Sequence, residues 1–118
     1  MARSLVVKVT CGAEDAERCN QAFTVAATAA ASGADVALWL TGEASWYGVA
    51  GRAEELDLPL ATPLDQLLAA VLATGSVTVC SQCAARRGVV AADLREGVTI
   101  AGAAVFTELV LGDRKSVV

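Results

Sequence analysis

Residues 5–40 read LVVKVTCGAEDAERCNQAFTVAATAAASGADVALWL, with two short apolar runs on either side of a longer, alanine-rich segment. The runs at residues 5–10 and 35–40 have the length and apolar composition of buried strands. Between them, an acidic turn opens a helix with apolar residues at helical spacing, and Ser32-Gly33 closes it. A strand, a helix and a second strand in this order predict a parallel pair joined by a crossover helix.

The same alternation continues to the end of the chain. Further helices are expected at residues 63–73, 81–87 and 101–110, and further strands at residues 77–80, 98–100 and 114–118. The glycine-containing loop between the second strand and the second helix is expected to carry at most a short helical turn. The pattern predicts an α/β fold, a three-layer α/β/α sandwich with a five-stranded parallel sheet, as a single domain over residues 1–118.

The composition is that of a folded protein without an extended basic surface. The chain has 118 residues, of which 55% are hydrophobic and 19% are charged, and its formal net charge is −4. This length suits one domain with a sizeable core, and the apolar content excludes a disordered chain. The negative net charge and the scattered arginine and lysine residues argue against a nucleic-acid partner.

The amino end does not resemble a signal peptide, and no apolar run reaches the roughly 18 residues that a membrane span needs. We therefore expect a cytoplasmic protein that does not bind a membrane. In a reducing compartment, the four cysteines are expected to remain thiols rather than form structural disulfides.

Several classes of site are excluded by residues that the chain lacks or spaces poorly. It contains no histidine, which excludes a Ser-His-Asp triad, a Cys-His pair and any histidine-ligated metal site. There is no G-x-G-x-x-G or Walker pattern, and Glu14, Asp15 and Glu17 follow Gly12 closely enough to repel a phosphate. Because the cysteine spacing also fits zinc poorly, we expect neither a cofactor nor a metal.

The thiol of Cys80 is the most probable reactive group in the sequence. It follows a predicted strand and precedes a predicted helix, a position where backbone amides favour the thiolate. Sites in open parallel sheets form beyond the carboxyl ends of the strands, which is where this residue is expected. Arg86 and Arg87 follow within two helical turns and are expected to stabilise the thiolate further.

The other cysteines have alternative interpretations. Cys83 shares a helix face with Cys80, so it is either a second, resolving thiol or a small packed residue. Cys11 also follows a strand and would approach Cys80 if the first and third strands were neighbours; otherwise it is a packed loop residue. Cys19 lies on the apolar face of the first helix and is expected in the core.

The aromatic pair Trp46-Tyr47 lies in the loop after the second strand. It is interpreted equally well as a lid over the reactive cysteine, as a contact between subunits or as ordinary packing. The sequence alone does not separate these three roles.

Several short motifs recur in the order and spacing of a known family. They are Cys80, Arg86-Arg87-Gly88-Val89, Gly97-Val98-Thr99-Ile100-Ala101-Gly102 and Asp113-Arg114, together with the Gly12 loop and the helix that ends at Ser32-Gly33. In this pattern the chain resembles, over nearly its whole length, the DsrE/DsrF-like family, which includes TusD-like and YchN-like sulfur-relay proteins. The resemblance implies a five-stranded parallel sheet between helices and a homo-oligomer, a trimer or hexamer.

The resemblance also implies a role for one residue. Cys80 matches the persulfide-carrying cysteine of the family, which implies a small sulfur-relay protein that accepts sulfur on this residue and passes it on. Sulfur donor and acceptor proteins are then its expected partners. Cys83 departs from the TusD-like pattern, which typically has a small apolar residue at this position.

Two other functions stay open at this point. The chain is alternatively a non-enzymatic oligomeric binding or scaffold module whose cysteines are merely buried. It is alternatively a thiol-disulfide redox protein that uses Cys80 and Cys83. The exposure of Cys80 and its distance from the other thiols are the observations that separate these functions.

Overall fold

The computed structural model describes residues 3–112 and 115–117. Its strands are Ser4–Val9 (β1), Asp35–Leu40 (β2), Ser76–Cys80 (β3), Val98–Ala101 (β4) and Lys115–Val117 (β5). Its α-helices are Ala16–Ala31 (α1), Leu64–Thr74 (α2), Ser81–Arg86 (α3) and Ala103–Leu111 (α4). Short 3-10 helices are Ala13–Asp15 (η1), Gly42–Gly48 (η2), Ala53–Glu55 (η3) and Ala91–Asp93 (η4). The predicted elements are present within about two residues of these bounds, and residues 114 and 118 of the last predicted strand lie outside the described residues.

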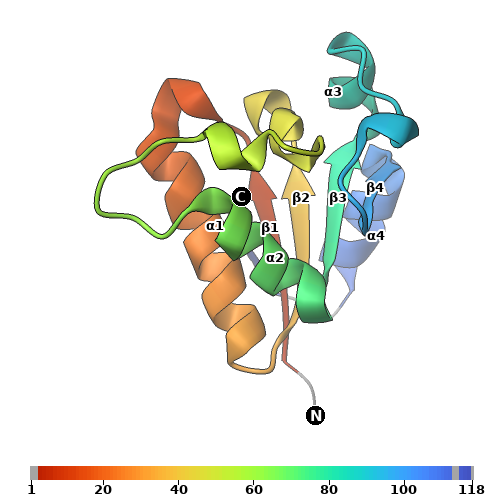
Figure 1. Ribbon diagram of the computed structural model, residues 1–118. Coiled ribbons are helices and arrows are strands. Elements are labelled where there is room, and N and C mark those ends of the chain that lie inside the picture. The colour runs from red at the N-terminus through yellow and green to blue at the C-terminus, as the bar shows by residue number, and fades with distance from the viewer. Residues whose placement is uncertain (1–2, 113–114, 118) are drawn as a thin grey trace.

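The strands form one parallel sheet in the order β4-β3-β2-β1-β5. From β1 to β4, each new strand is added on the same side, so right-handed crossovers place α1 and α2 on one face of the sheet. The chain then returns to place β5 beside β1, and this reversed direction puts α4 on the opposite face (Figure 1). The predicted α/β/α sandwich with a five-stranded parallel sheet is therefore confirmed.

The larger part of the core lies between the sheet and the layer formed by α1 and α2. Phe23 of α1 and Leu68 of α2 are fully buried, and Leu38 and Leu40 of β2 belong to the same cluster. Burying an apolar side chain of this size stabilises the fold by about 1.5–3 kcal/mol relative to leaving it exposed. This layer holds the sheet rigid beneath the loops at its carboxyl end.

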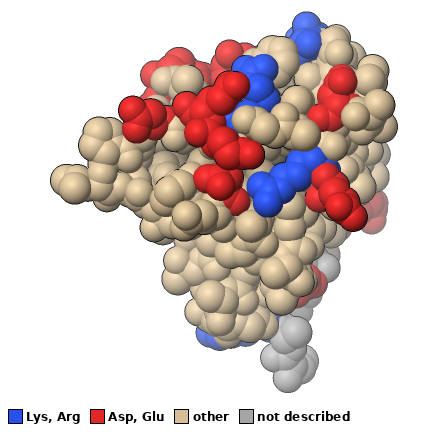
Figure 2. Space-filling model, viewed as in Figure 1, with Lys and Arg blue, Asp and Glu red and all other residues tan. Residues whose placement is uncertain are grey.

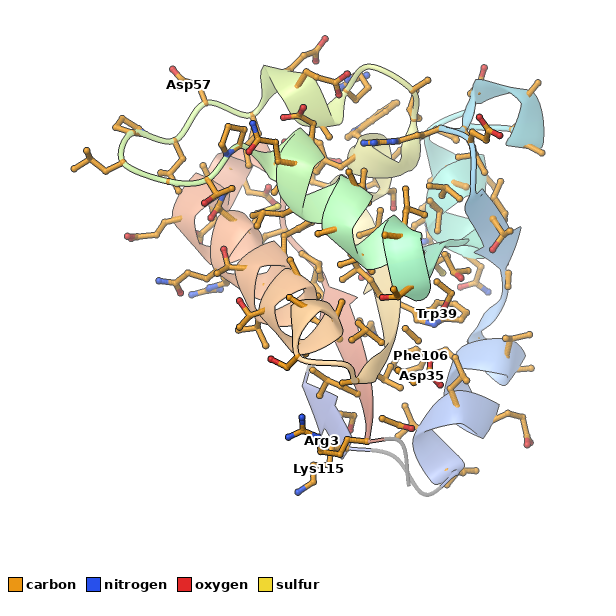
Figure 3. All side chains as sticks on the ribbon, turned by 60° about the horizontal axis from the view of Figure 1, so that its bottom comes forward. Arg3, Asp35, Trp39, Asp57, Phe106 and Lys115 are labelled. Carbon is orange, nitrogen blue, oxygen red and sulfur yellow. The ribbon has the colours of Figure 1, made fainter. Side chains whose placement is uncertain are left out.

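The second face of the sheet has a smaller core under α4. Trp39 of β2 packs edge-on against Phe106 of α4, with ring centroids 5.2 Å apart (Figure 3). Val6 and Ala37 complete the buried cluster, and the Nζ of Lys8 lies 5.3 Å from the centre of the Phe106 ring. Since β2 places Trp39 on one face and its neighbours on the other, the strand is buried on both sides.

The loop after β2 contains the expected helical turn, η2, and its aromatic pair packs within the chain. Tyr47 is buried, and its ring meets that of Phe23 edge-on at 6.5 Å. Trp46 lies half-buried under the guanidinium of Arg52, which is 4.6 Å from the ring centre. Of the three interpretations of this pair, packing is the one that these contacts support.

Charged side chains are unevenly distributed over the visible face of the molecule. Figure 2 shows Asp and Glu gathered at the upper end, toward which the strands of Figure 1 point, with Lys and Arg between them. Mixed charge of this kind is unlike the continuous basic surface that binds a nucleic-acid backbone. Among the helices of the described residues, none combines the length and apolar character needed to cross a membrane.

Candidate functional site

Cys80 lies at the carboxyl end of β3 and is the residue from which α3 begins. Its neighbours across the sheet are the end of β2, where Leu40 pairs with Val79, and Ala101 at the end of β4. The side chain is partly exposed, and the sulfur is a free thiol. The strand and its neighbours thus hold a reachable sulfur at the edge of the sheet where the sequence predicted a site.

Partial burial of Cys80 acts to raise the pKa of its thiol and is the largest single influence on it. The nearby backbone N–H groups of Cys83 and Gln82, the Cys83 thiol and the positive charge of Arg86 all favour the thiolate. Together they outweigh burial, so the pKa of Cys80 lies below its ordinary value of 9.0. A lowered pKa gives this thiol more of the nucleophilic thiolate at neutral pH.

Cys83 lies one helical turn beyond Cys80 and is also partly exposed. Its Sγ accepts a hydrogen bond from the backbone N–H of Gly42 at 3.3 Å, which links α3 to the start of η2. Gly42 has a φ of +54°, and a Cβ at this position would lie 2.6 Å from the carbonyl oxygen of Thr10. Because a side chain here would clash with backbone, only glycine can bring this N–H to the sulfur.

The two arginines after Cys83 make different contacts. Arg86 is exposed and lowers the pKa of Cys80 through its charge. Arg87 donates from Nε to Glu43 Oε2 at 2.9 Å, has its Nη2 2.8 Å from the same oxygen, and donates from Nη1 to the Cys83 carbonyl at 3.1 Å. Arg87 therefore ties α3 to η2 and positions Cys83, while Arg86 is the cation left to act on Cys80.

Cys11 is not brought beside Cys80. The condition for their approach, that β1 and β3 be neighbours, is not met, because β2 lies between them. Two strand spacings separate the ends of β1 and β3 by roughly 10 Å, beyond the roughly 7 Å between Cα atoms that a disulfide spans. Cys11 instead lines a hollow of about 410 Å³ beside β1 and α1, together with Lys8 and Arg18.

The environment of Cys11 disfavours its thiolate. Burial of the side chain raises the pKa of the thiol, and the carboxylates of Asp15 and Glu14 raise it further. Its Sγ donates a weak hydrogen bond, 3.8 Å long, to the carbonyl oxygen of Asp15. A thiol that is buried beside two acidic groups remains protonated and weakly nucleophilic at neutral pH.

Cys19 occupies the core, as its helical position predicted. Its side chain has 0% exposure, and burial raises the pKa of the thiol to about 12. Within residues 3–112 and 115–117, no group of three or more Cys, Asp or Glu side chains is arranged to hold a metal ion. Cys19 belongs to the buried apolar cluster between α1 and the sheet, so it acts as a small core residue.

Two contributors to the site were not anticipated from the sequence. The N–H of Gly42 binds Cys83, and the carboxylate of Glu43 binds Arg87. Both lie at the end of β2, so the β3–α3 turn is completed by the neighbouring strand. The available signal was a glycine two residues after a buried strand, but interpreting it required knowing that β2 pairs with β3.

Comparisons with known proteins agree on the fold and the family. Among solved structures, the ychN protein from E. coli superposes with a TM-score of 0.78 at 20% identity, covering 99% of this chain and 98% of that chain. The protein of unknown function MTH1491 from Methanobacterium thermoautotrophicum gives a TM-score of 0.66 at 12% identity, with coverage of 99% and 98%. No relative was found among curated proteins. The model of the DsrE/DsrF-like family matches residues 3–117, so this chain belongs to the DsrE/DsrF-like family.

Proposed function

We propose that this protein is a sulfur-relay protein that carries sulfane sulfur as a persulfide on Cys80. In the loading step, the Cys80 thiolate attacks the outer sulfur of a donor persulfide, and the donor leaves as a thiolate. In the unloading step, an acceptor thiolate attacks the outer sulfur on Cys80, which leaves in its turn. The observation that carries this proposal is a partly exposed thiol at the junction of β3 and α3, whose pKa is lowered by the backbone N–H groups of the helix start and by Arg86.

The remaining residues of the site have supporting roles in this proposal. Arg86 stabilises the Cys80 thiolate by its charge, and Arg87 holds the turn in place through Glu43. Cys83 is the second thiol of the site, because it lies one helical turn beyond Cys80 and is also partly exposed. Cys11 would act as a second thiol only if another molecule, or a rearrangement, brought a persulfide to it.

Intact-mass measurement after incubation with a persulfide donor tests the proposal. The wild type is expected to gain the mass of one sulfur atom, and Cys80→Ser is expected to gain none. Cys11→Ser is the matched control, since it removes a thiol outside the proposed site and should load like the wild type. Equal loading of wild type and Cys80→Ser would show that another group carries the sulfur.

We propose further that the protein works in the cytoplasm as a homo-oligomer, a trimer or hexamer, and exchanges sulfur with donor and acceptor proteins. Apart from Thr107 and Glu108, helix α4 is apolar, yet none of its residues is fully buried within the single chain. Val105 is 50% exposed and Leu111 is 77% exposed, an arrangement that favours burial against another subunit. Light scattering should give a multiple of the chain mass, which Val105→Glu should reduce; a monomeric wild type would contradict this assembly.

A thiol-disulfide redox protein is the second candidate function, and one observation favours it. Cys80 and Cys83 are both partly exposed free thiols in a Cys-x-x-Cys segment at the start of α3, the spacing of dithiols that form a reversible disulfide. This function predicts that mild oxidation removes two hydrogen atoms from the wild type and none from Cys83→Ala. It also predicts no gain of sulfur from a persulfide donor, which separates it from the relay.

A further inference from the structure

The hollow beside β1 and α1 follows a part of β1 that the described residues of β5 do not cover. Its volume is about 410 Å³, and it is lined by residues 7–11 on the strand side and by Arg18, Gln21, Ala22 and Val25 of α1. We infer that an extended peptide segment of another protein docks here, adding to the edge of β1 as a strand and placing a carboxylate beside Arg18. This docking site goes beyond the proposed sulfur transfer and does not depend on it.

The outer edge of β1 is paired over only part of its length. On its inner side β1 pairs with β2 from end to end, whereas on its outer side the described residues of β5 pair with Leu5 to Val7 alone. The outer ladder, as far as the structure describes it, therefore stops where the hollow begins. A strand edge left without a neighbour is a template on which another chain can pair.

Backbone groups of β1 border the hollow. The N–H of Thr41 donates to the Val9 carbonyl at 2.9 Å, so the backbone groups of Val9 point toward β2. Because these groups alternate between the two edges of a strand, those of Lys8 and Thr10 point to the outer edge, beside the hollow. The Lys8 side chain lies on the other face of the sheet, where its Nζ is 5.3 Å from the centre of the Phe106 ring. An occupant must therefore pair with amide groups, as a strand does.

The shape of the hollow also suits a strand. At about 3.3 Å per residue, the strand side from residue 7 to residue 11 measures roughly 13 Å, which is room for four or five residues of an added strand. The four residues of α1 recur at the spacing i, i+3, i+4 and i+7, so they form one stripe along the opposite wall. A groove between a strand edge and a helix receives both the backbone and the alternate side chains of an extended peptide.

The side chains of the hollow set the chemistry of the segment. Two valines of β1 line it together with Ala22 and Val25 of α1, and Val25 is 48% exposed, so small or β-branched apolar side chains fit against this wall. The guanidinium of Arg18 lies at the hollow, 77% exposed, in a 3.4 Å ion pair with Asp15. A pair this long and exposed is weak, so Arg18 is free to bind a carboxylate of the occupant instead.

The test uses an acetylated peptide amide of alternating threonine and valine that ends in aspartate, titrated into the isotope-labelled chain and followed by NMR. Two further forms carry N-methyl groups on alternate backbone amides, one form on each set, because only one set of an added strand faces β1. The parent peptide is expected to bind with a dissociation constant of about 1 mM, with shifts confined to residues 7–11 and 18–25. One N-methylated form should bind at least about tenfold more weakly, and the other should bind like the parent.

Substitutions in α1 locate the docked peptide. Val25→Glu places a carboxylate in the apolar wall and should weaken binding by about tenfold. Thr28→Glu is the matched control, because Thr28 is exposed on the same helix but does not line the hollow, and it should bind like the wild type. Arg18→Gln should weaken binding of the aspartate peptide by about threefold and leave an asparagine-ended peptide unaffected.

Equal affinity of the two N-methylated forms, whether high or low, overturns the inference, and so does a parent peptide that leaves residues 7–11 unshifted. Shifts of these residues that depend on protein concentration alone would assign the edge to a second copy of the chain. Binding that appears only after removal of Val118 would assign it to the end of the chain itself. Either result also overturns the inference. Sulfur is not loaded on Cys80 in any of these measurements, so their outcome is separate from that of the proposed function.

Discussion

The chain carries two pairs of cysteines at the same end of one sheet, and their environments are opposite. Cys80 and Cys83 are partly exposed, and backbone N–H groups and Arg86 favour negative charge on the Cys80 sulfur. Cys11 and Cys19 are buried, and burial, reinforced by Asp15 and Glu14, raises both of their pKa values. All four residues are cysteines, but the backbone conformation and the charges around the sulfur differ between the two pairs.

This difference shows that a position after a parallel strand does not by itself make a cysteine reactive. Cys11 follows β1 as Cys80 ends β3, but the turn after Cys11 runs into the acidic η1 before α1 begins. The turn after Cys80 enters α3 directly, so the free N–H groups of the first helical turn lie near its sulfur and favour the thiolate. The reactive pair is therefore decided by how each strand joins its helix.

Of all the expected differences, the greatest is between the alkylation rates of Cys80 and Cys19 in the folded protein. A pKa of about 12 leaves Cys19 with about a thousandfold less thiolate at pH 7 than a thiol of pKa 9.0, and burial also blocks the reagent. Pulse labelling with iodoacetamide, followed by unfolding and isotopic labelling, should modify Cys80 first and Cys19 only after unfolding. Labelling of Cys19 at a rate similar to Cys80 would abolish the contrast between the pairs.

Removing the Cys83 side chain should make Cys80 less reactive. Cys83→Ala deletes a thiol that lowers the pKa of Cys80, so the alkylation rate of Cys80 at pH 7 should fall roughly fivefold. Cys83→Ser retains a donor and should lose less. If the two variants react with Cys80-directed reagents at the wild-type rate, the Cys83 side chain does not stabilise the thiolate.

Substitutions of the two arginines test whether a nearby positive charge lowers the pKa of Cys80. Arg86→Gln removes a charge that lowers the pKa of Cys80, so the midpoint of its pH–rate profile should move up. At a pH below both midpoints, less thiolate is present and the rate should fall roughly threefold, while at high pH the rates should converge.

Arg87→Gln is the matched control for this measurement, because the Arg87 guanidinium is already paired with Glu43. It should shift the profile less than Arg86→Gln does. A larger shift from Arg87→Gln would reverse the roles assigned to the two residues.

The smallest expected effect concerns the unreactive pair. Glu14→Gln removes one carboxylate that raises the pKa of Cys11, but burial is the larger cause and is unchanged. Alkylation of Cys11 should therefore rise by no more than about twofold. A tenfold rise, measured by the same labelling, would mean that charge rather than burial keeps this thiol inert.

Much of the architecture was predictable because local periodicity encodes it. The apolar runs of β1 and β2, the alanine-rich face of α1 and the position of Cys80 at a strand end were all apparent before the fold was known. The core position of Cys19 followed from helical spacing alone. These features depend on residues a few positions apart, whose relative directions are set by the element they belong to.

Local residue patterns establish that the chain alternates strands and helices and that one thiol ends a strand at the head of a helix. Which strand lies beside that thiol depends on the packed fold: β2 separates Cys11 from Cys80 and brings Gly42 and Glu43 to the Cys83 turn. Strand order arises from the packing of helices across the whole sheet. A contact between residues 42 and 83 has no counterpart in the local spacing of either segment.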